Sequence, residues 1–471
     1  MLHVLNAITL PLIGDVNLST SLLIVFAICL LAVVGFEFVN GFHDTANAVA
    51  TVIYTKALKP VYAIPWSGTF NFLGVFLGGV AVAMGILKLL PLDELMKLPV
   101  SVGACMVLAV LIASIVWNLG TWYLGIPCSS SHTLIGAMIG ASIAFTWYYG
   151  GAGVNWDKAK EIGLSLILSP LIGFGAAAGL MYLLIHVIKW KALFHIPKGE
   201  NDTPPIVIRL LLITTCTLVS FFHGSNDGQK GVGLLMLILI AFVPAKFAVN
   251  HAIPNDKILL SLNNTEQVLS RTTATGTSQA LILTTDSAIE KAKTQLADKV
   301  DTVKTYKFRK EIKAVSKGVT AILSSKDIKL VDKDRATITE ASKQITGITD
   351  FAPIWVIATI SISLGIGTMV GWKRIVVTIG EKIGNEHLNY AQGASSELVA
   401  AATIGLSSSF GLPVSTTHVL SSGIAGSMMA SGGKGNLNSK TLKNIALAWI
   451  LTLPVAIILA LLLFMFFHLF I

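Results

Sequence analysis

The chain has 471 residues, of which 54% are hydrophobic and only 13% are charged, and its mean hydropathy is +0.74. An ordinary soluble domain is about one quarter charged, so this composition excludes a soluble globular protein and predicts one embedded in a lipid bilayer. The net charge of +9 arises partly from loop lysines such as Lys189, Lys191 and Lys198, a pattern typical of cytoplasmic membrane loops and not of nucleic-acid binding.

Apolar stretches that can span a bilayer recur along the whole chain. In chain order they lie at 21–39, 62–89, 102–123, 162–188, 206–222, 232–249, 354–370 and 445–471, and shorter ones lie at 133–148, 398–406 and 419–429. A spanning helix needs about 20 residues, so we expect about ten to twelve helices. The N-terminal segment lacks the basic region of a signal peptide, so we expect the first span to be retained.

The fold class follows from the same stretches. Backbone polar groups in lipid must pair internally, and the short alternating strands of a barrel do not occur in the sequence. The sequence therefore predicts an all-α polytopic membrane protein. The four cysteines lie in or beside apolar segments without metal-ligand spacing, so we expect neither a disulfide framework nor a zinc site.

Two pairs of motifs indicate an internal duplication. The segment GFHDTANA at 41–48 is matched by GSNDGQKG at 224–231, with Asp44 and Asp227 in register. The segment GIPCSSSH at 125–132 is matched by GLPVSTTH at 411–418, where the glycine, the proline, three consecutive hydroxyl residues and the histidine all recur. Chance is a poor explanation for two matches in the same order.

The second copy contains an insertion. Asp44 and Asp227 stand 183 positions apart and His132 and His418 stand 286 apart, so about one hundred extra residues lie in the second copy. Residues 250–350 turn polar and rich in Lys, Asp, Ser and Thr, which is typical of solvated helices. We favour a soluble appendage over a catalytic domain. The predicted organisation is a first membrane repeat at 1–190, a linker loop at 191–206, the start of a second membrane repeat at 207–249, a polar soluble insert at 250–350 and the remainder of the second repeat at 351–471.

Four carboxylates in apolar sequence are candidates for cation handling. Asp44 and Asp227 lie beside apolar runs at equivalent places of the two copies, and ionisable groups inside a membrane are costly enough to mark function. The alternative is that both occupy exposed helix ends, but two aspartates in register favour the functional interpretation. Glu37 and Glu397 are further candidates for binding a proton or another cation.

The two hydroxyl triplets are candidates for binding an anion. Each follows a Gly-x-Pro break and precedes apolar helical sequence, which predicts a helix N-terminus with a hydroxyl cap. Such an end presents free backbone N–H groups, hydroxyl donors and a positive dipole end, which together suit a tetrahedral oxyanion. Ordinary capping explains one hydroxyl residue at a helix end, but it does not explain three consecutive hydroxyl residues at both helix ends. The candidate ligands are Ser129, Ser130, Ser131, Ser415, Thr416 and Thr417.

Residues next to these motifs have two interpretations each. His132 and His418 directly follow the triplets and either contact the ligand or are satisfied polar groups in the first helical turn. Lys230 occupies the register position of Asn47, so the second copy has a fixed positive charge where the first has an amide. The lysine either offsets the anion's charge and replaces a bound cation, or extends to the membrane interface.

At these residues the sequence resembles the inorganic phosphate transporter (Pit) family, and within it the bacterial low-affinity type. The resemblance rests on GFHDTANAVAT, GSNDGQKGVG, GIPCSSSHTLIG and GLPVSTTHVLSSGIAG and covers nearly the whole chain except the insert. It implies two inverted repeats with broken or re-entrant helices at the substrate site, in a bacterial inner membrane. It also implies symport of phosphate with protons, in many cases as a neutral metal–phosphate complex, whereas other members use sodium.

The resemblance also assigns residues and partners. It implies that Asp44, Asn47 and the first triplet form one half of the site, and that Asp227 and the second triplet form the other. The sequence departs from the family pattern at His43, and at Gln229 and Lys230 where Ala-Asn is usual, which disfavours a symmetric pair of sodium sites and favours protons. His43 and Asn226 are further possible contacts. We expect no resident cofactor or metal. The expected partners are phosphate and the lipid bilayer, and a homo-oligomer is one possible assembly.

Three alternatives follow from the same residues. Hydroxyl and N–H groups read shape and charge, so another tetrahedral oxyanion such as sulfate or arsenate is a rival substrate. An intramembrane hydrolase using Ser131 or Thr417 with a histidine is less favoured, because adjacent helical residues do not face each other and the sequence has no Gly-x-Ser-x-Gly elbow. A passive channel is the third.

Overall fold

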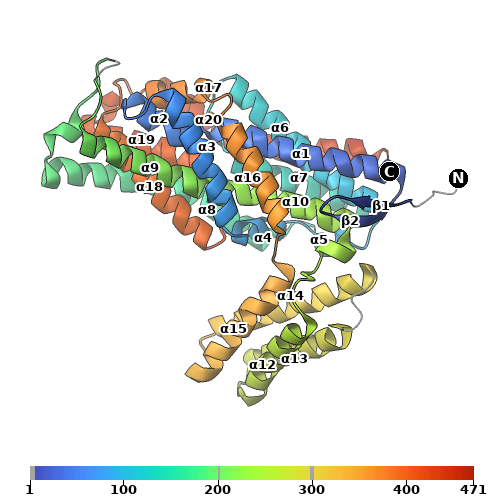
Figure 1. Ribbon diagram of the computed structural model, residues 1–471. Helices are drawn as coiled ribbons and strands as arrows, with labels where there is room; N and C mark the ends of the chain where they lie inside the picture. The colour runs from blue at the N-terminus through green and yellow to red at the C-terminus, as the bar shows by residue number, and fades with distance from the viewer. Residues whose placement is uncertain (1–5, 152, 200–201, 297–301, 471) are drawn as a thin grey trace.

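The computed structural model describes residues 6–151, 153–199, 202–296 and 302–470. These residues are almost entirely helical, which confirms the expected class (Figure 1). One exception precedes the first span: β1 (Asn6–Leu10) and β2 (Gly14–Leu18) form an antiparallel hairpin that the sequence analysis did not predict. Gly14, at a φ of +77°, supplies the turn, and the alternation in β2 buries Val16 and Leu18 against the helices.

The first half of the chain forms eight α-helices before the linker. They are α1 (Thr20–Asp44), α2 (Ala46–Tyr54), α3 (Pro60–Leu77), α4 (Ala81–Leu87), α5 (Leu92–Leu95), α6 (Val100–Tyr123), α7 (Ser130–Tyr149) and α8 (Trp156–Leu183). A π-helical turn η1 (Leu184–Ile188) and a 3-10 turn η2 (Lys191–Phe194) follow.

The second half begins with α9 (Ile206–His223), a π-helical turn η3 (Gly224–Gly228), α10 (Gln229–Phe242) and α11 (Pro244–Phe247). After the insert it continues as α16 (Ile354–Thr368), α17 (Lys373–Val377), η4 (Thr378–Lys382), α18 (Tyr390–Ser409), α19 (Thr416–Gly432), a 3-10 turn η5 (Lys434–Asn436) and α20 (Ser439–His468). In both halves, therefore, the helix that carries the first motif is interrupted at the motif.

Five continuous helical stretches are long and apolar enough to cross a membrane: Thr20–Tyr54, Val100–Tyr123, Trp156–Ile188, Ile206–Phe242 and Ser439–His468. The pair α3 and α4, bent by 71°, makes a broken span. The shorter or more polar helices α7, α16, α18 and α19 pack among them. Among the described residues, five helical stretches therefore pass as spans by length and apolarity, or six with the bent pair α3 and α4, which is fewer than the expected ten to twelve.

The two halves interlock through close helix crossings. Helix α7 packs on α20 and α19 packs on α8, so each helix that follows a hydroxyl triplet has a long apolar neighbour. A Cβ on Gly140 would lie 2.0 Å from the carbonyl oxygen of Ile457, and one on Gly426 would lie 2.2 Å from that of Phe174. Gly140 and Gly426 are 286 positions apart, the same offset as the two histidines. Small residues permit such crossings in membranes.

Residues 250–350 form a separate bundle beside the membrane body (Figure 1). Its helices are α12 (Asn255–Arg271), α13 (Gly276–Leu296), α14 (Thr302–Ser324) and α15 (Asp332–Thr349). They enclose their own apolar core, which includes Leu262, Ile289 and Ile345. The backbone N–H of Asn250 donates to the carbonyl of Ile348 at 2.8 Å, so the two ends of the bundle leave the membrane body side by side.

Candidate functional site

Both aspartates lie at breaks in membrane helices. Asp44 is the last residue of α1, and the hydroxyl of Thr45 donates to the carbonyls of Gly41 at 2.6 Å and Thr368 at 2.9 Å, which holds the break between α1 and α2. Asp227 lies in the π-helical turn between α9 and α10. Both side chains are buried, which excludes the exposed helix ends weighed above. Irregular backbone at membrane depth is tolerated where protein surrounds it.

Each hydroxyl triplet caps a helix, as predicted. Ser129 caps α7 by accepting from the N–H of His132 at 3.2 Å, and Ser415 caps α19 by accepting from the N–H of His418 at 3.1 Å. The first hydroxyl of each triplet is therefore used within its own helix. The next two are left to contact other groups.

The two helix ends converge on Asp44. Ser130 donates to its Oδ2 at 2.9 Å and Thr417 donates to its Oδ1 at 2.7 Å, so one hydroxyl from each triplet binds the same carboxylate. Ser131 accepts from Lys230 and donates to the carbonyl of Val414 at 2.7 Å. The triplets, 286 positions apart in the chain, thus form one buried polar centre.

Asn47 and Lys230 make crosswise contacts between the halves. The amide of Asn47 donates to Thr417 at 2.9 Å and to Thr416 at 3.4 Å, whereas the ammonium of Lys230 donates to Ser131. Each residue after a break therefore contacts the triplet of the other half. Lys230 is only 1% exposed and lies 2.7 Å from Oδ1 of Asp227, so it does not extend to the interface as one interpretation had it.

His223 is a site residue that the sequence analysis missed. Its Nε2 lies 3.5 Å from Oδ2 of Asp227 and 3.9 Å from Oδ2 of Asp44, and its Nδ1 lies 2.7 Å from Oδ1 of Asn71. An amide oxygen only accepts, so Nδ1 carries a proton, and Nε2 faces the two carboxylates. His223 ends an apolar run one turn before Asp227. The argument that ionisable residues inside a membrane mark function, which singled out the aspartates, therefore applies to His223 as well.

The three side chains Asp44, His223 and Asp227 have the chemistry of a cation site. Their ligand atoms all lie within 4.8 Å of one another. Nε2 of His223 and Oδ2 of Asp227 are buried and have no hydrogen-bond partner among the described residues. One imidazole nitrogen and two carboxylates, with the second ring nitrogen held by an amide oxygen, are a donor set typical of divalent metals.

The two residues next to the aspartates serve different purposes. His43 lies 3.2 Å from Oδ1 of Asp44 through Nδ1 and 3.2 Å from Thr121 through Nε2, so it orients the carboxylate. Asn226 turns away from the centre. It donates to the carbonyl of Leu412 at 3.1 Å and accepts from the N–H of Val414 at 3.2 Å, which holds the segment that precedes the second triplet.

His132 and His418 meet each other and do not bond to Asp44. Their ring centroids are 4.5 Å apart, and His418 stacks on Trp449 at 3.9 Å. Nδ1 of His132 lies 2.8 Å from the hydroxyl of Ser129, and Trp449 donates to the carbonyl of Pro127 at 3.3 Å. The three rings therefore pack in a row beside the two helix ends that carry the triplets.

The two glutamates occupy different places. Glu397 accepts from Thr51 on α2 and from Thr215 on α9 at 2.5 Å, so it joins the broken helices of both halves away from the triplets. Glu37 lies on α1 and is fully buried. A Cβ on Gly231 would lie 2.3 Å from it, so Glu37 packs against α10 at the residue that follows Lys230.

Comparisons with known proteins identify the family to which the chain belongs. Residues 40–460 match the family described as the phosphate transporter family. The chain is 39% identical to the low-affinity inorganic phosphate transporter PitA of Escherichia coli (strain K12), over 96% of this chain and 98% of that protein. It is also 39% identical to the low-affinity inorganic phosphate transporter of Buchnera aphidicola subsp. Acyrthosiphon pisum (strain APS), over 94% of this chain and 96% of that protein.

A solved structure described as the sodium-dependent phosphate transporter shares the fold, with a TM-score of 0.55 and 21% identity over 95% of this chain and 100% of that one. The relatives are bacterial and the body consists of apolar helices, in agreement with the expected location in a bacterial inner membrane. The family is one of transporters, which sets aside the intramembrane hydrolase. The chain belongs to the phosphate transporter family and is a membrane-embedded transporter of the Pit type, whose substrate is phosphate.

Proposed function

We propose that this protein imports inorganic phosphate together with a divalent metal, by symport with a cation, and that the coupling cation is the proton and not sodium. The observation that supports this most is the convergence of two hydroxyl-lined helix N-termini, one from each repeat, on a buried centre that contains Asp44, Asp227 and Lys230. Helix N-termini bind oxyanions, and transporters with inverted repeats bind substrate where broken helices meet.

The choice of coupling ion follows from Lys230. Its side-chain nitrogen lies 2.7 Å from Oδ1 of Asp227 and fills space beside this carboxylate that a sodium ion bound to Asp227 would otherwise take. The register position in the first repeat is the neutral Asn47. A second sodium site at Asp227 is therefore disfavoured, which favours the proton as the coupling cation.

The metal would enter as part of the cargo. Nε2 of His223 and the carboxylates of Asp44 and Asp227 offer three protein ligands, and phosphate oxygens and water would complete the coordination of a divalent cation. A cation that binds beside phosphate lowers the net charge that crosses the apolar interior. The cargo then moves by alternating access, as two bodies of the protein rearrange around the loaded centre.

The test is uptake of labelled phosphate into proteoliposomes under an inward proton gradient, an inward sodium gradient or neither. We compare wild type with Asp44→Asn, and with Asp256→Asn as a matched control at an exposed position in the insert. We expect the proton gradient to drive accumulation of phosphate against its own concentration gradient. Asp44→Asn should abolish this accumulation, and Asp256→Asn should retain it. Uptake driven by sodium alone would refute the coupling, and equal inhibition by sulfate would refute the selectivity.

The metal is tested separately with His223→Gln. We expect wild type to require a divalent cation at a concentration near that of phosphate and to transport the metal in step with it. In His223→Gln we expect the metal concentration for half-maximal uptake to rise by about tenfold or more, because supporting and direct ligands each contribute about 10- to 100-fold to metal affinity. Uptake by wild type that is unaffected by chelation would reject metal co-transport and leave phosphate transport standing.

A further inference from the structure

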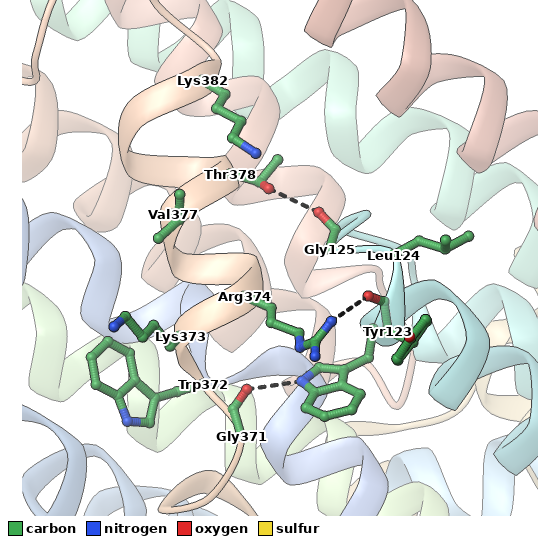
Figure 2. A pocket seen from close by; sticks show the side chains of 11 residues that line it. Tyr123, Leu124, Gly125, Gly371, Trp372, Lys373, Arg374, Val377, Thr378 and Lys382 are labelled. Carbon is green, nitrogen blue, oxygen red and sulfur yellow. Dashed lines mark hydrogen bonds between the residues drawn. The ribbon is translucent and has the colours of Figure 1, made fainter.

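An open cavity of about 600 Å³ lies between the end of α6 and the segment formed by α17 and η4 (Figure 2). One wall is the chain from Trp122 to Gly125, and the other runs from Gly371 to Lys382. The indole of Trp122 donates to the carbonyl of Gly371 at 2.8 Å and Thr378 donates to the carbonyl of Gly125 at 2.8 Å, so both walls are held in place.

The cavity presents cationic groups and no carboxylate among its described lining residues. The guanidinium of Arg374 donates to the carbonyl of Tyr123 at 2.7 Å and lies 5.1 Å from the ring centroid of Trp122, which fixes its position. The ammonium of Lys382 points toward the gap between Thr378 and Gly125 (Figure 2). The adjacent Glu381 does not offset this charge from within the cavity, since it is bound by the hydroxyl of Tyr54 at 2.8 Å.

The cavity adjoins a second one of about 150 Å³, which shares Gly125, Thr378 and Lys382 with it and extends to Ile126 and Pro127. Pro127 stands two residues before Ser129, which caps the first triplet helix. Lys382 therefore stands where the two cavities meet. The smaller cavity borders the segment that precedes the first triplet.

The equivalent segment of the other repeat, at Gly411, packs tightly against α4. A Cβ on Gly411 would lie 3.1 Å from the carbonyl of Ala81, and one on Gly85 would lie 2.8 Å from the carbonyl of Gly411. Helix α4 is held against this segment by Gln229, whose side-chain oxygen accepts from the N–H of Val82 at 2.7 Å. At Gly125, by contrast, the nearest atom to an added Cβ would be 3.5 Å away. Packing is therefore looser beside Gly125, which borders both cavities, than beside Gly411.

We propose that this cavity is the vestibule through which free inorganic phosphate reaches the binding centre from one face of the membrane, with Arg374 and Lys382 as its anion-attracting groups. The inference rests on the proposed function. Cationic groups in a cleft with low-dielectric walls raise the local concentration of anions and their rate of association, and added salt weakens the effect. A lysine on a flexible stem suits transient contact, because the phosphate must also leave.

The same phosphate chemistry would bind a lipid headgroup, so the experiment separates the two sources. Full-length wild type, Lys382→Gln and Arg374→Gln are reconstituted in vesicles of neutral phosphatidylcholine, and in vesicles that also contain anionic phosphatidylglycerol. Lys160→Gln makes the same change at an exposed lysine on α8 and serves as the control. Initial rates of phosphate uptake are measured against phosphate concentration at low and high salt.

In neutral vesicles we expect the KM for phosphate to rise by about three- to tenfold in both variants, with little change in maximal rate and a smaller effect at high salt. As a second measurement, Leu124→Cys should react with a negatively charged thiosulfonate reagent, and phosphate should slow the reaction. An unchanged KM, or an effect seen only with anionic lipid, would overturn the vestibule while phosphate transport stands. Wild type without phosphate uptake would overturn the proposed function and the vestibule together.

Discussion

Replacing Lys230 by asparagine separates the charge of this residue from its hydrogen bonding. Asparagine is the residue at the equivalent position of the first repeat, where Asn47 donates to the opposite triplet. Lys230→Asn can therefore keep a donor near Ser131 but removes the ammonium from Asp227. Both members of this ion pair are about 1% exposed and lie 2.7 Å apart.

The size of the effect follows from burial. Removing one partner of a buried ion pair costs about 3–5 kcal/mol, because the other charge stays in a poorly solvating place. Phosphate that binds beside the unpaired Asp227 meets the same uncompensated charge, so at about 1.4 kcal/mol per factor of ten the variant should lose about a hundredfold or more in phosphate uptake at low substrate concentration. A cation that binds Asp227 would restore the missing charge, so we expect sodium to recover much of the uptake in the variant and to leave wild type unchanged.

The assay measures uptake of labelled phosphate into proteoliposomes with the internal and external pH each held fixed, so that the proton gradient is the same throughout. The sodium concentration is raised stepwise from zero. Lys160→Asn makes the same substitution at an exposed position and should behave as wild type. Undiminished uptake by Lys230→Asn without sodium would refute the electrostatic reasoning. An impaired variant that sodium does not rescue would show that the lysine has another role than replacing a bound cation.

Three further outcomes are expected. Replacing residues 251–347 by a linker of about four Gly and Ser residues should keep phosphate uptake within about twofold of wild type, because the ends of the bundle are already hydrogen bonded to each other; loss of uptake by correctly inserted protein would contradict this. Gly140→Ala should lower thermal stability in detergent by about 1–3 kcal/mol, since its Cβ would meet a carbonyl of α20, whereas Gly120→Ala, which has open space around it, should not. In the bundle expressed alone, Lys293→Met should cost at most about 1 kcal/mol of unfolding free energy by chemical denaturation at pH 7. The hydrogen bond from Lys293 lowers the pKa of Glu266, so this loss should vanish as the pH falls below the ordinary Glu value of 4.5; a loss that persists at pH 2.5 would contradict the ion pair as its cause.

Local features of the site could be predicted from the sequence because local rules govern them. A Gly-x-Pro break followed by hydroxyl residues places Ser129 and Ser415 at helix caps wherever the helices pack. The helical class follows from the length of the apolar stretches. The hairpin at 6–18 was missed because two strands of five residues carry too short a pattern to notice beside long apolar runs.

Contacts between distant residues could not be predicted in this way. That Lys230 binds Ser131, 99 positions away, depends on how α10 and α7 pack, and that Asn226 holds the chain before the second triplet depends on α18 and α19. The stacking of His132 on His418 likewise arises from tertiary packing. His223 is a different case, since its position in an apolar run was visible in the sequence.

The crosswise contacts of Asn47 and Lys230 carry a consequence for how such a protein arose. Because each triplet takes one donor from the other copy, a single repeat would lack the donors that Asn47 and Lys230 supply, and two identical repeats would be needed to restore them. In such a homodimer any substitution occurs twice, and a lysine at both positions would bury two like charges at one centre. In one continuous chain the two positions vary independently, so a lysine can stand at one of them only.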